Sequence, residues 1–276
     1  MKALTLEDQK KLLLEIMDTF HLFCEEHQLT YYLFYGSLLG AVRHQGFIPW
    51  DDDIDVIMHY QDYERFLSLW AEAKHPFLKL GHHRSKHFKQ YPWSFAKLVD
   101  TRTIFKRKDA SKRYQPIGVS IDIFPLYPAL DQDHACLVSE LQELEHRLDL
   151  KRYSLKKHLK ILVTYVKLKK PIIALKQLGL LMLTLPQSNK SFVKKQEKLL
   201  EQTKAINKAM FFFTPSESDA TFPKSSFEST SDVIFEGRQY KTVKESNRIL
   251  AEYYGDYLKP PPTEKQVGHP AKPFLK

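Results

Sequence analysis

Apolar residues recur every three or four positions between residues 6 and 28, a spacing that places them on one face of an amphipathic helix. Thr5 and Asp8 precede this run in the arrangement of a helix start. The same periodicity predicts helices over 61–73 and 244–254. Each of these helices has an apolar face to bury, so we expect them to cover a common core.

Short runs of β-branched and aromatic residues lie between the predicted helices and are typical of strands. The clearest are residues 30–35, 54–58 and 119–124, and we expect Pro125 to stop the last one. Three weaker strand candidates and a hairpin around Glu236-Gly237 complete the set: 77–80, 94–99, 103–106 and 233–240.

The second half of the chain has a different pattern. Residues 131 to about 208 are helical in periodicity, 214–232 are rich in Ser, Thr and Pro and predict a loop, and an irregular tail follows Lys259. We therefore predict an α+β protein. Residues 1–130 form a mixed sheet with flanking helices, and residues 131–276 form a mainly helical region with an irregular C-terminal tail.

Composition narrows the class of protein. Hydrophobic residues make up 43% of the 276 residues, which excludes wholesale disorder. Two cysteines are too few for a disulfide framework, and the acids near the N-terminus do not fit a signal peptide. The net charge of +9 favours partners that carry phosphate: a nucleotide, a nucleic acid or an anionic membrane.

The basic excess belongs to one amphipathic segment, residues 151–200. It contains thirteen Lys or Arg and one acid, Glu197, so the rest of the chain has a net charge of −3. Apolar residues at helical spacing alternate with the lysines, and Pro171 is placed to start a second helix. Three interpretations stay open: a solvated helix pair that covers the core, a membrane-surface segment, and, as the least favoured, a nucleic-acid contact.

Acidic residues cluster around the predicted strand 54–58. Side chains alternate across a strand, so Asp53 and Asp55 point to the same face, and Asp51 joins them if the strand begins early. Carboxylates this close repel one another unless a cation lies between them, and Mg²⁺ prefers such oxygens. Asp122, between Ile121 and Ile123 in another apolar strand, also needs a partner or a metal.

A second feature completes the pattern. Gly36-Ser37 follows the strand at 30–35, and such a turn supplies N–H groups and a hydroxyl for phosphate oxygens. An acid-rich turn by itself is most often a solvated loop. The combination of Gly36-Ser37, an Asp-x-Asp strand and a later strand acid is the layout of a two-metal phosphoryl-transfer site.

These residues also carry a family resemblance. The chain resembles the LicD family, bacterial phosphocholine transferases of the nucleotidyltransferase fold superfamily that are related to fukutin and the fukutin-related protein; it is most similar to pneumococcal-type members. The similarity spans most of the chain and is weakest over 131–230. The matching stretches are Tyr35–His44, Gly46–Val56, Phe95–Asp100 with Thr103, Ser120–Leu126, Phe235–Gly237 and Tyr254–Leu258 with Pro261-Pro262.

The resemblance implies a nucleotidyltransferase-fold catalytic core and a metal-dependent reaction. Phosphocholine would pass from CDP-choline to a sugar hydroxyl, with CMP leaving. The acceptor implied is a lipid-linked glycan: a teichoic acid precursor as first choice, or another surface glycan. Mg²⁺ or Mn²⁺ is the cofactor expected. The enzyme would be cytoplasmic, with peripheral contact to an anionic membrane at its inner face, and we expect no nucleic-acid partner.

The family pattern carries over to single residues here. Asp51, Asp53, Asp55 and Asp122 are the expected metal ligands; Asp53, Asp55 and Asp122 are the expected catalytic residues, with Asp122 assisting deprotonation of the sugar hydroxyl. The substrate-binding residues expected are Gly36, Ser37, Arg43, His44 and Lys97. Arg43 and Lys97 would neutralise the diphosphate, and His44 would contact substrate or hold its loop.

Three other functions remain open from the sequence. A related enzyme would transfer another alcohol phosphate, such as ribitol phosphate, from its CDP form. A nucleotidyltransferase that acts on RNA would use the basic segment to bind its substrate, and steep salt dependence would mark it. A non-catalytic scaffold would not need the full set of acids, so it is the least favoured.

Overall fold

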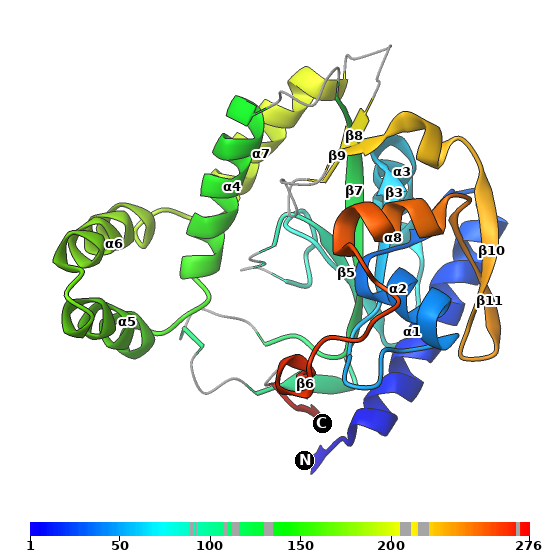
Figure 1. The fold of residues 1–276 in the computed structure, drawn as a ribbon, viewed down its shortest axis with the longest axis horizontal. Coiled ribbons are helices and arrows are strands. Elements are labelled where there is room, and N and C mark those ends of the chain that lie inside the picture. The colour runs from blue at the N-terminus through cyan, green and yellow to red at the C-terminus, as the bar shows by residue number, and fades with distance from the viewer. Residues whose placement is uncertain are drawn as a thin grey trace.

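The protein is an α+β structure in which helices flank a mixed central sheet (Figure 1). The computed structural model describes residues 1–88, 91, 93–106, 110–111, 116–129, 135–204, 211–214, 221–268 and 271–276. The helices described are α1 (Leu6–Glu26), α2 (Tyr35–His44), α3 (Tyr60–Glu72), α4 (Ala135–Leu150), α5 (Leu155–Lys167), α6 (Pro171–Thr184), α7 (Asn189–Lys204), α8 (Ser246–Tyr254) and the short 3-10 turns η1 (Lys224–Phe227) and η2 (Thr263–Lys265).

Most of the strands described are short. They are β1 (Lys2–Ala3), β2 (Tyr32–Leu33), β3 (Asp55–His59), β4 (Leu78–Gly81), β5 (Ala96–Asp100), β6 (Thr103–Phe105), β7 (Ser120–Ala129), β8 (Phe211–Phe213), β9 (Thr221–Pro223), β10 (Thr230–Phe235), β11 (Arg238–Val243) and β12 (Pro273–Leu275). β7 is long enough to pair with β3 and β5 at its start and with β8 at its end.

The central sheet has the order β2-β3-β7-β5-β4, and β8 extends it from the far end of β7. β3 and β7 pair in parallel, whereas the other pairs are antiparallel. β7 lies in the middle and pairs with β3, β5 and β8. Because its first residues pair with β3 and β5, the register of β7 decides which side chains of the three strands meet.

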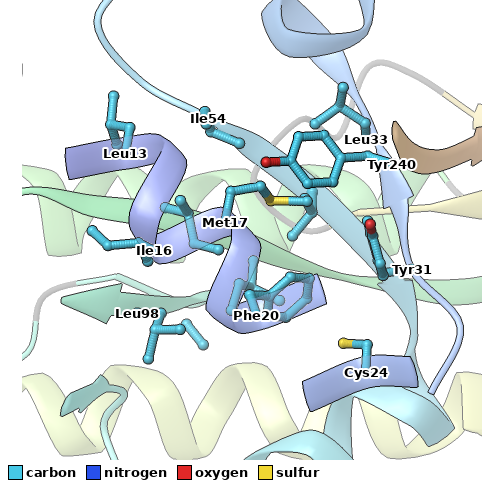
Figure 2. Packing of buried hydrophobic residues seen from close by; sticks show 14 of the residues in the cluster. Leu13, Ile16, Met17, Phe20, Cys24, Tyr31, Leu33, Ile54, Leu98 and Tyr240 are labelled. Atoms are coloured by element: carbon cyan, nitrogen blue, oxygen red, sulfur yellow. The ribbon is translucent and has the colours of Figure 1, made fainter. Parts of the chain in front are cut away.

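One face of the sheet is covered by α1 and α3. Leu13, Ile16, Met17 and Phe20 of α1 point onto the sheet, and each is at most 1% exposed (Figure 2). The capping box predicted at Thr5 and Asp8 is present. The 3.6-residue period of the sequence thus becomes the buried stripe that anchors the first helix to the sheet.

The opposite face of the sheet packs against α2 and α8. Ile57 of β3 and Phe124 of β7 are buried there together with Leu38 of α2 and Ile249 of α8. Residues of one strand alternate between the two faces: Val56 and Met58 of β3 pack with α1, whereas Ile57 packs with α2. A polar side chain at an odd position of β3 therefore lies on the α2 face.

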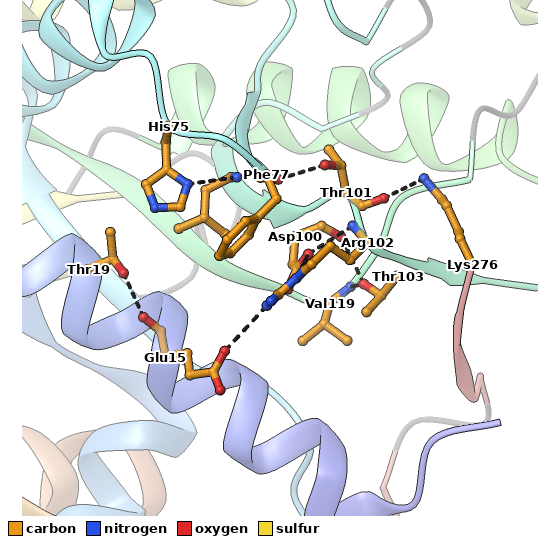
Figure 3. A network of polar contacts seen from close by, with 11 residues as sticks. Glu15, Thr19, His75, Phe77, Asp100, Thr101, Arg102, Thr103, Val119 and Lys276 are labelled. Atoms are coloured by element: carbon orange, nitrogen blue, oxygen red, sulfur yellow. Dashed lines mark hydrogen bonds and ion pairs between the residues drawn. The ribbon is translucent and has the colours of Figure 1, made fainter. Parts of the chain in front are cut away.

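Chain segments far apart in sequence are joined at one end of the molecule. β12 pairs with β1 and β6, and Lys276 Nζ donates to the carbonyl oxygen of Thr101 at 2.7 Å. In the same region the Arg102 guanidinium binds the fully buried carboxylate of Asp100 and reaches Glu15 of α1 (Figure 3). The tail predicted to be irregular thus ends in a strand that closes this network.

Two further predicted features differ from the structure, and one is confirmed. β7 continues through Pro125 and Pro128 to Ala129; Pro125 stands opposite Met58 in the ladder, so a proline does not end this strand. The predicted loop 214–232 contains β9 and the start of β10. The predicted hairpin is present: Glu236 and Gly237 both have positive φ, the conformation that a two-residue turn requires.

α4 and α7 pack against each other and against the far end of β7, and α5 and α6 extend beyond them as a helical hairpin (Figure 1). The clusters that hold α4 and α7 include Leu141 and Leu200 with Tyr127 of β7. The hairpin projects from the body, whereas α7, which contains the end of the segment 151–200, packs on β7; the helix pair α5–α6 therefore does not cover the central sheet. The domain division at residue 130 stays a prediction; β8, α8 and β12 do pack on elements of the first 130 residues.

Candidate active site

Three charged residues form a row across the centre of the sheet. In the parallel β3–β7 pair, Asp55 stands opposite Asp122, and in the antiparallel β5–β7 pair, Lys97 stands opposite Asp122. The neighbours of each residue in its strand pack on the α1 face, which places all three on the α2 face. The sheet therefore brings together two acids and a lysine that lie 25 to 67 residues apart in the sequence.

Lys97 and Asp122 form an ion pair in which Nζ contacts both carboxylate oxygens. Both side chains are largely buried, at 12% and 13% exposure. Lys97 Nζ also lies 5.1 Å from the ring centres of Trp93 and Phe95, so aromatic faces stabilise its charge. Lys97 was expected to bind the diphosphate, which stays a prediction; in the structure its ammonium group is paired with Asp122.

The acid-rich loop runs alongside this row. A carboxylate oxygen from each of Asp51, Asp52 and Asp53 lies within 4.8 Å of the other two. Burial, and then the charges of Asp53, Asp122 and Asp51, raise the pKa of the Asp55 carboxyl well above its ordinary value, and Lys97 opposes this. Four predicted acids thus act on one another in a site of low solvent access.

The arrangement fits a divalent cation. Carboxylate oxygens are the ligands that Mg²⁺ and Mn²⁺ prefer, and like charges so close are costly without a cation between them. Asp52 adds a carboxylate that the sequence did not single out, because it lies on the opposite side of an Asp-x-Asp alternation. That Asp51, Asp53, Asp55 and Asp122 bind metal stays a prediction.

The first turn of α2 borders the acids. A Cβ atom on Gly36 would lie 2.9 Å from Oδ2 of Asp51, so glycine permits this close approach. Tyr35 enters the helix with a φ of 47°, a strained conformation for an aromatic residue. Gly36-Ser37 was expected in a turn after a strand; the turn is also a helix N-terminus, where N–H groups lack partners within the helix.

Ser37, which was expected to contact phosphate, makes a structural contact within the protein. Its hydroxyl oxygen accepts a hydrogen bond of 2.8 Å from the N–H of Asp55, and the residue is 4% exposed. The bond fixes the start of β3 against α2, and hence the position of Asp55. Because a hydroxyl can accept and donate, the predicted contact with phosphate remains open to it.

Three residues that were not among the predicted site residues hold the acid-rich loop. Gln9 Nε2 donates to the carbonyl oxygen of Asp52 at 2.6 Å, and Lys10 Nζ donates to the carbonyl oxygens of Ile48 and Pro49 at 3.2 Å each. The carboxylate of Glu236 accepts from the N–H of Phe47 at 3.1 Å.

Only Glu236 had a signal in the sequence. It lies in the stretch Phe235–Gly237 that resembles the family, whereas Gln9 and Lys10 lie in an ordinary amphipathic helix. The two α1 residues act on a loop about forty residues away, which periodicity does not predict.

Arg43 and His44 lie at the other end of α2. Arg43 comes seven positions after Gly36, which is about 10 Å along a helix axis. Arg43 donates to the carbonyl oxygen of Tyr257 at 2.8 Å and to Nε2 of His44 at 2.9 Å. Partial burial, and then the charges of Arg43 and Lys10, lower the pKa of His44. The structure thus gives Arg43 a role in joining α2 to the C-terminal segment, and its predicted contact with substrate stays a prediction.

Comparison with known proteins places this site in a family. The family described as LicD/FKTN/FKRP, nucleotidyltransferase domain, matches residues 28–158, which carry Gly36, Ser37 and all the predicted acids. The lipopolysaccharide cholinephosphotransferase LicD of Haemophilus influenzae is 33% identical over 98% of this chain and 97% of its own length. An uncharacterised protein of Rickettsia typhi is 34% identical over 39% of this chain and 34% of its own.

The mixed sheet, the row of acids and the adjoining helix N-terminus define a phosphotransferase built on a nucleotidyltransferase domain. The chain belongs to the LicD family, because the Haemophilus influenzae LicD protein is similar to it over nearly the whole length of both chains. The resemblance found in the sequence is therefore confirmed, as are the α+β fold class and the assignment as an enzyme.

Proposed function

We propose that the protein transfers phosphocholine from CDP-choline to a sugar hydroxyl of a lipid-linked surface glycan and releases CMP. The observation that carries the proposal is the register of Asp55, Asp122 and Lys97 beside Asp51, Asp53 and the first turn of α2. The relative from Haemophilus influenzae, named for cholinephosphate transfer to lipopolysaccharide, supports the transferred group and a surface glycan. A teichoic acid precursor remains our first choice of acceptor.

Asp51, Asp53, Asp55 and Asp122 would bind Mg²⁺ or Mn²⁺. The bound cation supplies positive charge at the diphosphate, where negative charge builds up as CMP leaves. The donor would place its diphosphate at the first turn of α2, where the N–H groups and the helix dipole favour an anion. Ser37, whose hydroxyl oxygen accepts from the N–H of Asp55, would use its O–H to contact the same oxygens.

Lys97 and Asp122 would have separate roles: Lys97 would bind the diphosphate, and Asp122 would accept the proton of the sugar hydroxyl. A diphosphate that enters the site competes with Asp122 for the Lys97 ammonium, and this frees a carboxylate oxygen of Asp122. That oxygen accepts the proton of the sugar hydroxyl while the sugar oxygen bonds to the phosphorus of phosphocholine. The bond from this phosphorus to the bridging oxygen breaks, and the bridging oxygen leaves with CMP.

A lipid-linked acceptor would place the reaction at a membrane, and we propose the inner face of the cell membrane, with the enzyme cytoplasmic and peripheral. No helix in the part of the chain that the structure describes is long and apolar enough to cross a bilayer. Such an enzyme would need to approach its acceptor from one side of the membrane.

The test is a donor and acceptor panel with the full chain. CDP-choline, CDP-ribitol and CDP-ethanolamine are each incubated with Mg²⁺ or Mn²⁺, with a lipid-linked teichoic acid precursor, with lipopolysaccharide, or without acceptor, and CMP release is measured. We expect release that needs metal, prefers CDP-choline, is stopped by EDTA and is restored by added Mg²⁺.

Each other result identifies an alternative. Preference for CDP-ribitol would reassign the enzyme to another CDP-alcohol. Transfer of CMP from CTP to RNA with release of pyrophosphate, and no CMP release from any CDP-alcohol, would show the RNA-directed nucleotidyltransferase. No CMP release with any donor and acceptor, from a protein that melts cooperatively, would refute the proposal.

A further inference from the structure

The α5–α6 hairpin exposes an unusual concentration of apolar side chains. Of the eighteen large hydrophobic side chains exposed among the described residues, eleven lie between residues 155 and 183. Single exposed apolar residues are ordinary on a protein surface, but a contiguous group marks an interaction site. The eleven are Leu155, Leu159, Val163, Val166, Leu168, Ile172, Ile173, Leu175, Leu178, Met182 and Leu183.

The exposed side chains share helix faces that the protein itself does not use. Leu155, Leu159, Val163 and Val166 are spaced as one side of α5. In α6 the positions turned toward α5 and α4 are occupied by buried residues such as Leu181. The hairpin buries one side and leaves the other apolar side open.

The hairpin is nevertheless well specified locally. Ser154 caps α5 by accepting from the N–H of Lys157, and Pro171 occupies the first turn of α6, where its missing N–H costs nothing. Lys169 takes a positive φ in the turn between the helices. The apolar surface therefore belongs to formed helices.

Charge identifies what fits this surface. Residues 151–185 contain nine Lys or Arg and no acid. A second copy of the chain would bring the same positive charge to the contact and be repelled. A bilayer with anionic headgroups offers both hydrocarbon for the leucines and negative charge for the lysines.

Two further features favour a membrane over RNA and favour lying on the bilayer over crossing it. Tyr165 is the only aromatic residue between residues 155 and 184, so the hairpin lacks the stacking platform of single-strand binders. The fourteen residues of α6 make a helix about 21 Å long, less than the roughly 30 Å of a hydrocarbon core.

We propose that the α5–α6 hairpin docks in the plane of a bilayer surface rich in anionic phospholipid, with its apolar face in the headgroup boundary and its lysines at the phosphates. The docking surface depends on the hairpin alone. Its use, which is to hold the acid site close to a lipid-linked acceptor, rests on the proposed function.

The test is co-sedimentation of the full chain with vesicles of phosphatidylcholine alone, or with about 30% phosphatidylglycerol. An apolar variant replaces Leu159, Leu175 and Met182 by Ser, and a charge variant replaces Lys156, Lys160 and Lys167 by Gln. Matched controls are Leu22→Ser and Lys11→Gln, which change exposed residues of α1. CMP release from CDP-choline with a water-soluble acceptor is measured on all of them.

We expect the wild type and both controls to bind anionic vesicles at least about tenfold more strongly than neutral ones, because lysines add to the apolar contribution. Both hairpin variants should lose at least about tenfold in binding, and 0.5 M salt should weaken binding of the wild type. The CMP release should stay within about twofold of wild type in every variant.

Three results would overturn the docking surface. The first is wild-type protein that does not sediment with anionic vesicles. The second is an apolar variant that binds as wild type does, which would leave an electrostatic contact without insertion. The third is a wild-type dimer in solution that becomes a monomer in the apolar variant, which would assign the face to a second copy. Because CMP release is measured separately, failure of the docking and failure of the proposed reaction are distinguishable.

Discussion

The acid site and the α5–α6 hairpin use charge in opposite ways. At the site, acids on β3, on β7 and in the adjoining loop are held by strand register, by Ser37 and by Lys97, and burial raises the cost of each charge. At the hairpin, positive charges without neighbouring acids in the sequence lie among exposed apolar side chains. The proposed cation site depends on the positions of single atoms, whereas the proposed membrane surface depends on the summed charge and apolar area of many side chains.

The comparison is tested most strongly by removing one acid. Asp53→Asn should lower kcat for CMP release at least about 1,000-fold, or roughly 4 kcal/mol in the barrier, because a lost carboxylate weakens metal binding where charge builds up. Asp232→Asn, at an exposed acid of β10, is the matched control and should stay within about twofold. Wild-type turnover in a folded Asp53→Asn protein would refute the metal assignment.

The second prediction compares packing in the two regions. Phe20 is fully buried and packs edge-on against Tyr31 and Phe66, so Phe20→Ala should lower the free energy of unfolding by about 3–5 kcal/mol. Leu159→Ala on α5 should change it by less than about 0.5 kcal/mol, because Leu159 is 61% exposed. Urea denaturation measures both, and equal losses would mean that the hairpin's leucines are packed in solution.

The third prediction concerns the ion pair of the site. Lys97→Met should lower kcat/KM for CMP release about 100-fold, because it removes the cation that faces Asp122 and the incoming diphosphate. Lys97→Arg keeps the charge and should recover part of the loss. If Lys97→Met melts as wild type does and keeps its kcat/KM, Lys97 has no role in the reaction.

The smallest expected effect is a pH-dependent change in melting temperature at Glu197, where α7 contacts the body of the protein. Hydrogen bonds from His83 and Arg84 lower the pKa of Glu197 from 4.5 to about 2. A carboxyl with a depressed folded-state pKa stabilises the fold above its ordinary pKa and loses this contribution as the pH falls toward 2. The difference in melting temperature between wild type and Glu197→Gln should therefore be largest above pH 5 and shrink toward pH 3. A difference that does not change between pH 6 and pH 3 would contradict this.

Local signals predicted much of this molecule because they depend on neighbours in the sequence. The capping box at Thr5 and Asp8, the hairpin at Glu236-Gly237 and the helix start at Pro171 were each visible in a few residues. Pro125 shows the limit of such reasoning. It indicates a strand end by itself, but the ladder with β3 continues past it.

The candidate site was predictable as a set of residue types and was not predictable as a geometry. The spacing of Asp53 and Asp55 and the apolar neighbours of Asp122 marked the acids. That Asp122 stands between Asp55 and Lys97 follows from the order β3-β7-β5, which no local pattern specifies. The hold of Gln9 and Lys10 on the acid-rich loop likewise depends on how α1 lies across the sheet.

The sequence by itself determined which side chains are candidates for the chemistry, where most elements begin, and that the positive charge is concentrated in one segment. These properties are local, because periodicity, capping and motif spacing act within a few residues. The tertiary structure decided the register that gathers the acids and showed that the α5–α6 hairpin projects with its apolar face open. Both depend on contacts between distant segments, and the free energy of those contacts comes from burial that only the assembled fold provides.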